Sequence, residues 1–159
     1  MSSDLRLTHP PIATKGMLIR RPPAEVFRAF ADPAVTTKFW FTHSTGALVA
    51  GAKLTWRWEM FGASASVTVK EVETDRRLVF DWGNEQAMRT VEMRFVPWQD
   101  HTFVNLVETG FTGTGDEMAA AAVDSASGFA LVFAAAKALL EHGITLTVVG
   151  DHVVPGLKL

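Results

Sequence analysis

The sequence predicts an α+β fold, in which a curved antiparallel sheet lies against one long helix near the C-terminus. The first observation is that residues 46–109 alternate between apolar and polar types with period two and are broken by short turns. The second is that residues 115–142 form the one long helical pattern, which can bury its apolar stripe by lying across that sheet. The third is composition, because 159 residues with 48% hydrophobic and 20% charged residues suit one folded domain.

We expect this domain to cover residues 15–144, between a loose arm over residues 1–14 and a tail over residues 145–159. The arm contains Pro10 and Pro11 and shows little periodicity. The tail, TLTVVGDHVVPGLKL, fits either a short added strand or a segment packed on the surface. Both alternatives stay open at this point.

The first part of the domain is predicted to contain one strand and two short helices. GMLIRRP indicates a strand over residues 17–21. Pro23 suits a first helical position, and AEVFRAFAD then places apolar residues on one helical face as far as Asp32. Pro33 can open a second short helix, PAVTTKFWF.

Five segments of alternating polarity follow, and each is predicted to form one strand: KLTWRWEMF, ASVTVKEV, RLVFDW, TVEMRFVP and TFVNLVET. Their connections are short, which favours antiparallel hairpins. Because side chains alternate across a strand, one face of KLTWRWEMF should carry four large side chains, Leu54, Trp56, Trp58 and Met60. The same parity brings further aromatic residues to this face, which we expect to look towards the long helix: Phe80, Trp82 and Phe95.

The long helix has recognisable ends. Thr114 and Glu117 form the pattern of a capping box at its start, and Gly143 supplies its stop. Its apolar stripe includes Phe129 and Phe133. Its middle, FAAAKA, is rich in alanine, and such small side chains either leave volume next to the sheet or let the two layers pack closely.

Composition and charge argue against several classes of partner. The net charge is -2 and the pI is about 6.2, so no general field attracts phosphate backbones and no nucleic-acid partner is expected. The absence of cysteine and of a signal-peptide run in MSSDLRLTHPPIA leads us to expect a cytoplasmic location. Lys137 interrupts the most apolar stretch, FALVFAAAKALL, so no membrane span is expected.

Several stretches together resemble a known family: RPPAEVFRAFADPAVTTKFWF, LVFDW, ETGFT and SGFALVFAAAKALLEHGI. These stretches, and the order of the predicted elements, resemble the helix-grip fold of the START-related superfamily. Within that superfamily, the local sequence resembles the group named after the C-terminal domain of the activator of Hsp90 ATPase. The resemblance implies a cavity between the sheet and the long helix, often for an apolar or amphipathic molecule. Relatives commonly place tryptophan after the helical glycine, whereas this chain has Phe129 after Gly128.

The residues predicted to line such a cavity are mostly aromatic: Trp40, Trp56, Trp58, Phe80, Trp82, Phe95, Phe129 and Phe133. Each can equally serve as ordinary core packing. The parity that buries Leu106 also directs Glu108 inward, where it would orient a ligand or act as a base, unless it is a surface carboxylate paired with Arg or Lys. His43 follows an aromatic run and is predicted at the cavity mouth, although an ordinary loop position is the alternative.

No metal, nucleophile or cofactor motif is predicted. The five histidines show neither H-x-x-x-H nor H-E-x-x-H spacing, and no cysteine can assist them. No G-x-S-x-G nucleophile elbow occurs. We therefore expect neither a metal ion nor another cofactor.

Three functions stay open and are ranked in this order. The first is a binding protein for a small hydrophobic molecule, held between sheet and helix. The second is a cofactor-free enzyme that uses Glu108 or His43 for proton transfer in the same cavity. The third is a cochaperone-like module with a chaperone partner, which would expose an apolar patch. A homodimer through the arm, the tail or an open sheet edge is compatible with all three.

Overall fold

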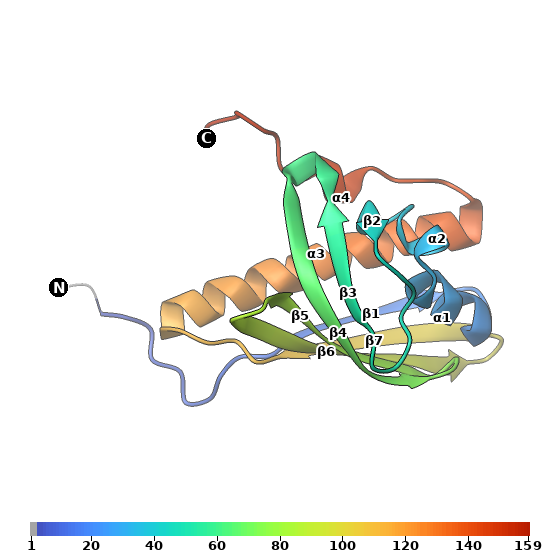
Figure 1. Cartoon of the computed structure of the whole chain (residues 1–159), viewed down its shortest axis with the longest axis horizontal. Helices are drawn as coiled ribbons and strands as arrows, with labels where there is room; N and C mark the ends of the chain where they lie inside the picture. The colour runs from blue at the N-terminus through green and yellow to red at the C-terminus, as the bar shows by residue number, and fades with distance from the viewer. Residues whose placement is uncertain (1–2) are drawn as a thin grey trace.

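A curved seven-stranded antiparallel sheet wraps around one long helix in the computed structural model, which describes residues 3–159 (Figure 1). The strands lie in the order β1-β7-β6-β5-β4-β3-β2. They are β1 (Ala13–Ile19), β2 (His43–Ser44), β3 (Lys53–Trp58), β4 (Ala63–Glu73), β5 (Arg77–Asn84), β6 (Ala87–Trp98) and β7 (His101–Thr109). The helical segments are α1 (Pro23–Ala31), α2 (Pro33–Thr36), η1 (Glu59–Phe61), α3 (Gly115–His142) and α4 (Val148–Asp151). The predicted helix-grip architecture is confirmed.

The N-terminal elements have bounds that differ from those predicted. Strand β1 begins at Ala13, because the whole segment from Ala13 to Ile19 finds backbone partners on β7. Helix α2 ends at Thr36 instead of continuing through the aromatic run. The hydroxyl of Thr36 donates a 2.6 Å hydrogen bond to the Ala29 carbonyl of α1, which ties the two short helices together. The aromatic residues that follow, Phe39, Trp40 and Phe41, therefore lie in the turn and loop after α2, and their side chains are buried in the core.

Strand β3 is shorter than its alternating pattern suggested. The 3-10 turn η1 follows Trp58 directly and ends at Gly62, which has the left-handed φ of 60° that glycine tolerates. The turn breaks the alternation of side chains. Met60, which we expected on the face shared by Trp56 and Trp58, is consequently exposed, and this part of the prediction was wrong.

Both predicted ends of helix α3 are found in the structure. The side chain of Thr114 accepts a hydrogen bond of 3.1 Å from the Glu117 amide. Gly143 adopts a φ of 65°, and its amide donates to the Leu139 carbonyl. By length and composition α3 would also suffice to cross a membrane, a test that core helices of folded domains pass as well. Here its inner face, including the fully buried Phe133, packs into the sheet.

The C-terminal end of α3 is fastened to the end of β1. The Lys137 ammonium donates to the Leu18 carbonyl at 2.7 Å and to the Glu141 carboxylate at 2.6 Å. The Arg20 amide donates to the same carboxylate at 3.0 Å. Burial raises the pKa of Glu141, but the bonds from Lys137 and Arg20 outweigh it and hold this pKa below its ordinary value.

Aromatic rings fill the core between α1, the sheet and α3. The ring of Phe30 lies 5.1 Å from Phe39, 6.0 Å from Phe95 and 5.9 Å from Phe133, measured between centroids. Edge-to-face contacts of this kind add to the large area that each ring removes from water. This end of the interlayer space is solidly packed, and any cavity has to lie nearer the start of α3.

Candidate ligand cavity

A cavity of about 250 Å³ lies between the concave face of the sheet and the middle of α3. On the sheet side it is lined by Trp58 of β3 and Trp82 of β5, whose ring centroids are 6.2 Å apart. Period-two alternation puts both rings on the concave face. Trp40, which follows α2, lies 5.8 Å from Trp82 and completes this aromatic wall.

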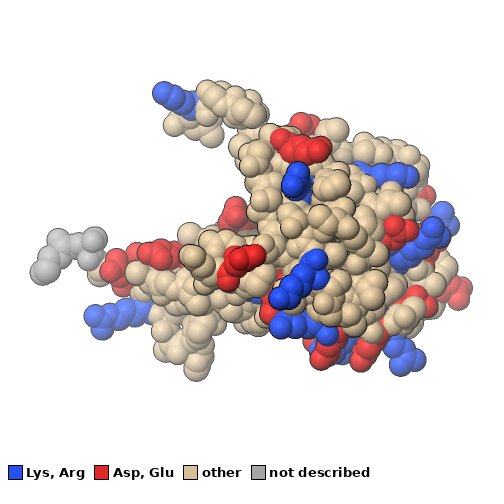
Figure 2. Space-filling model, in the orientation of Figure 1, with Lys and Arg blue, Asp and Glu red and all other residues tan. Residues whose placement is uncertain are grey.

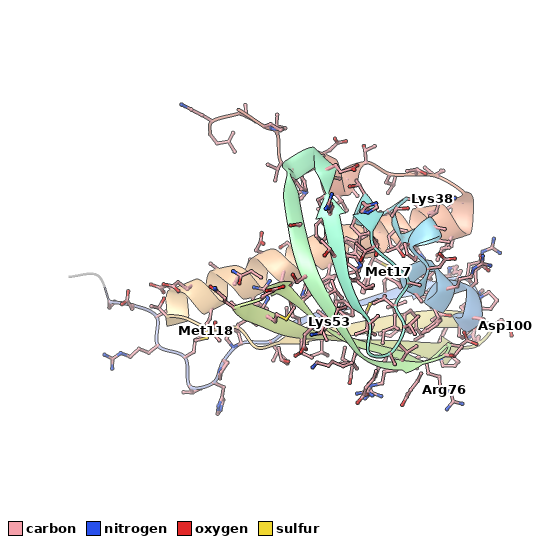
Figure 3. The ribbon with its side chains drawn as sticks, viewed as in Figure 1. Met17, Lys38, Lys53, Arg76, Asp100 and Met118 are labelled. Carbon is pink, nitrogen blue, oxygen red and sulfur yellow. The ribbon has the colours of Figure 1, made fainter. Side chains whose placement is uncertain are left out.

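Helix α3 forms the opposite wall with residues that recur at helical spacing: Ser125, Gly128, Phe129 and Val132. Gly128 matters most for the free space, because a Cβ built on it would meet no other atom within 4 Å. The Phe129 ring stands beside this gap, 5.6 Å from Trp40 and 5.7 Å from Trp82. Figure 3 shows the side chains between sheet and helix and labels Met118 in the first turns of α3.

The alanine-rich segment FAAAKA, in the second half of α3, does not border the cavity. Ala135 and Ala136 have no exposed surface and belong to the main core. Their small side chains therefore allow close packing of the two layers, which was one of the two alternatives predicted for FAAAKA. The free volume lies earlier in the helix, at Gly128.

Glu108 of β7 lies behind the cavity wall and accepts hydrogen bonds from three residues that line the cavity. Its carboxylate has no exposed surface and accepts hydrogen bonds from the Trp82 indole at 2.6 Å, from Nε of Arg89 at 3.1 Å and from the Ser125 hydroxyl. These donors come from β5, β6 and α3. A buried carboxylate is costly unless it is paired and hydrogen-bonded, and Glu108 is both. It therefore joins the two layers at this end of the grip.

Arg89 is the basic residue in the cavity wall. The Arg89 guanidinium carbon lies 4.8 Å from the centroid of the Phe111 ring. The Arg89 side chain as a whole is 34% exposed. Asp124, an exposed residue of α3, also borders the cavity. The opening thus combines aromatic walls with one cation–carboxylate pair and one solvated carboxylate.

The C-terminal tail closes part of the opening. Val149 of α4 and His152 line the cavity together with Phe61 of η1, and the rings of Phe61 and His152 are 5.8 Å apart. The tail therefore packs on the surface, the second of its two predicted alternatives, and forms a short helix there. Figure 2 shows a hollow below the tail on the left of the view, with acidic side chains along its lower edge.

The structure brings together only some of the residues predicted for the site. Trp40, Trp58, Trp82 and Phe129 line the cavity. The other predicted aromatic residues are buried in the core around it: Trp56, Phe80, Phe95 and Phe133. Glu108 lies behind the wall, and the predicted surface ion pair of this residue is instead a buried one with Arg89.

His43 lies away from the cavity. It belongs to the edge strand β2, is exposed, and stands opposite Arg57 of β3 on the outer face of the sheet. Neither Glu108 nor His43 is among the residues that line the cavity, so the two side chains proposed for proton transfer do not face a ligand there.

Sequence reasoning missed Phe61, Arg89, Val149 and His152 as cavity residues. Arg89 lies just before TVEMRFVP and has the same parity as Val91 and Met93, a signal that would have pointed it inward. For the tail residues no local pattern gives the direction, because their position depends on how the chain turns after Gly143.

Comparison with known proteins identifies the family and the fold. The family model described as "Activator of Hsp90 ATPase homolog 1-like protein" matches residues 20–141. A crystal structure of a Staphylococcus saprophyticus protein is similar with a TM-score of 0.74 and 25% identity, over 86% of this chain and 96% of that one. The Aha1 dimer of Colwellia psychrerythraea gives a TM-score of 0.72 with 18% identity, over 84% of this chain and 98% of that one.

A third similar structure is DynU16, a protein of the dynemicin biosynthetic locus. It has a TM-score of 0.74 and 19% identity, over 84% of this chain and 48% of that one. No curated protein matches the chain. At these identities the structures establish a shared fold, and the site has to be interpreted from the side chains of this chain.

Proposed function

The chain belongs to the family of activator of Hsp90 ATPase homolog 1-like proteins, and from this premise we propose that it binds a small hydrophobic or amphipathic molecule between the sheet and α3. The observation that carries the proposal is the cavity of about 250 Å³ walled by Trp40, Trp58, Trp82 and Phe129. Ligand sites are typically concave and apolar with a few polar groups, and this cavity has that composition.

Leaving such an apolar space unfilled has an energetic cost. Well-packed interiors contain few voids larger than a water molecule, and apolar cavity walls forfeit contacts that a ligand would restore. The polar network of Glu108 holds Trp82 and Arg89 in fixed positions. A preformed wall of this kind lowers the entropic cost of binding.

Native mass spectrometry of the protein isolated from its host tests the proposal, because a bound molecule would appear as a defined mass increment. Titration with apolar ligands should also change the tryptophan emission, since Trp58 and Trp82 line the site. The test variant is Gly128→Leu, whose Cβ enters open space and whose larger side chain fills part of the cavity. We expect this variant to fold and to lose the bound molecule. A parent protein with neither a mass increment nor a fluorescence response to any ligand would refute the proposal.

A cochaperone-like function is the second candidate, and an exposed apolar patch favours it. Val96 and Phe103 stand opposite each other on β6 and β7, and both are exposed together with Trp98. Contiguous apolar side chains on the surface are typical of protein-binding sites. The Aha1 neighbour is a dimer, which supports a homodimer as one occupant of this patch, and the family description, which refers to an activator of Hsp90 ATPase, supports a chaperone as another.

An ATPase assay with purified Hsp90 tests this second function. Stimulation by the parent protein that is lost in Trp98→Ser, and retained in Gly128→Leu, would place the activity on the outer face of the sheet. No stimulation at saturating protein would remove the chaperone partner from consideration.

A further inference from the structure

We propose that the ligand of this cavity is a neutral, flat aromatic molecule with a hydrogen-bond acceptor, and that a terminal nitrogen of Arg89 donates to that acceptor. This inference rests on the proposed binding function and specifies its ligand. It follows from the size of the cavity, the shape of its walls and the arrangement of charge around Arg89.

Size and shape come first. A volume of about 250 Å³ is below the roughly 300–1,000 Å³ of pockets that hold drug-sized ligands. One or two fused rings therefore suit it better than a lipid chain. The wall is aromatic, with Trp58 and Trp82 on the sheet, and the Phe129 ring of α3 packs against Trp82 beside them at 5.7 Å. Planar ligands gain offset-stacked and edge-to-face contacts from such walls.

Arg89 supplies the donor. Its Nε bonds to Glu108, and within residues 3–159 the structure shows no hydrogen bond from its two terminal nitrogens. The residue lines the cavity and is about one-third exposed. A guanidinium carries donors only, so the ligand group that it recognises has to be an acceptor.

Glu108 acts as a positioning residue for this recognition. One carboxylate oxygen, Oε2, accepts from both Trp82 Nε1 and Arg89 Nε. Trp82 and Arg89 are also direct cross-strand partners of β5 and β6. The stacking surface and the donor are consequently fixed relative to each other, and a ligand that satisfies one is aligned with the other.

The charges around Arg89 and the apolar walls together favour a neutral ligand. Arg89 and Glu108 compensate each other, and Asp124 adds a carboxylate at the opening. An anionic ligand would bring a further negative charge beside Glu108 and Asp124, whereas a cationic ligand would approach the Arg89 guanidinium. Either ion would also lose hydration between apolar rings, which a neutral molecule avoids.

Four naphthalenes that differ at one position test the inference by isothermal titration calorimetry. They are 2-acetylnaphthalene, its isostere 2-isopropenylnaphthalene without the acceptor, the anion 2-naphthoate and the cation 2-naphthylmethylammonium. We expect the acetyl compound to bind about tenfold more tightly than the isopropenyl compound, as one hydrogen bond to a charged donor implies. Both charged compounds should bind more weakly than the acetyl compound.

Two arginine variants assign the donor. Arg89→Met removes every guanidinium donor and supplies none, while Trp82 and Ser125 still donate to Glu108, so the acetyl to isopropenyl affinity ratio should fall to about one. Arg94→Met is the control, because Arg94 is on the outer face of the same strand, and the ratio should stay about tenfold.

The outcomes separate this inference from the binding function on which it rests. Equal affinity for the acetyl and isopropenyl compounds, or tightest binding of either ion, overturns the inference while cavity binding stands. An unchanged ratio in Arg89→Met overturns the role of Arg89. If none of the four compounds binds the parent, the ligand class is wrong, and a co-purified molecule in native mass spectrometry then decides the binding function by itself.

Discussion

Replacing Glu108 with leucine should lower the free energy of unfolding by about 3–5 kcal/mol, as expected when one partner of a buried charge pair is removed. Glu108 is fully buried and accepts from Trp82, Arg89 and Ser125. Leucine accepts nothing, so an indole, a hydroxyl and a guanidinium lose their partner together. Each unsatisfied buried group costs about 1–3 kcal/mol, and water recovers part of the cost at Arg89, which is 34% exposed.

Urea unfolding at neutral pH, followed by tryptophan emission, measures this loss as a lower midpoint with an unchanged slope. Glu92→Leu is the control. Glu92 is on the outer face of β6 and bonds to Arg77 and Arg94 where water has access, so its loss should cost less than that of Glu108.

The double variant Glu108→Leu with Arg89→Met should be more stable than Glu108→Leu alone, because it leaves no unpaired cation in the wall. A Glu108→Leu protein that unfolds at the parent's urea concentration would refute the reasoning. It would mean that the Glu108 carboxylate does not hold the sheet and α3 together. The fixed positions of Trp82 and Arg89 in the cavity wall could then not be attributed to Glu108.

Three further predictions concern the cavity wall and the end of α3. Gly128→Ala should raise the free energy of unfolding by up to about 1 kcal/mol in urea titrations, because alanine favours helix and its Cβ meets no atom within 4 Å; a destabilised variant would mean that the space is occupied. Glu141→Gln should cost about 1 kcal/mol at pH 7 by weakening the bond with Lys137. Because the pKa of Glu141 is lowered in the folded protein, this stabilisation is present above the unfolded pKa of about 4.3 and disappears as pH falls through the folded pKa, so parent and variant should converge in acid. Val149→Asp should loosen α4 and increase acrylamide quenching of tryptophan, and unchanged quenching would contradict the role of α4 as a cover.

The inward direction of the strand residues could be predicted because it depends only on alternation along each strand. Trp58 and Trp82 face α3 for this reason, and Glu108 points inward as its parity required. The same rule failed at Met60, where a 3-10 turn replaces the strand. Alternation predicts which way a side chain points only as long as the strand continues, and its last residue depends on contacts between strands.

The depth of each inward residue could not be predicted from the pattern. Trp56 and Trp58 have the same parity, yet Trp56 is buried in a stack with Phe41, at 4.4 Å, whereas Trp58 borders the cavity. The difference arises because the residues after α2 fill the space above Trp56. The depth of each residue depends on how segments distant in sequence pack against one another, and a local sequence pattern does not contain this information.

The position of the cavity along α3 depends on the size of the side chain at particular positions of the helix. The overall composition of the helix does not determine it. Alanine at 135 and 136 lets the helix approach the sheet closely, and that approach removes the volume which small side chains would otherwise leave. At Gly128 the helix cannot move closer, because the indole of Trp82 and the ring of Phe129 already stand 5.7 Å apart beside it. Glu108 prevents the layers from sliding past this obstacle by bonding to Ser125 on one side and Trp82 on the other. A gap opposite a glycine therefore persists where rings hold the layers apart and a buried carboxylate fixes them, and Arg89 beside that gap is the residue to which our proposal assigns ligand selection.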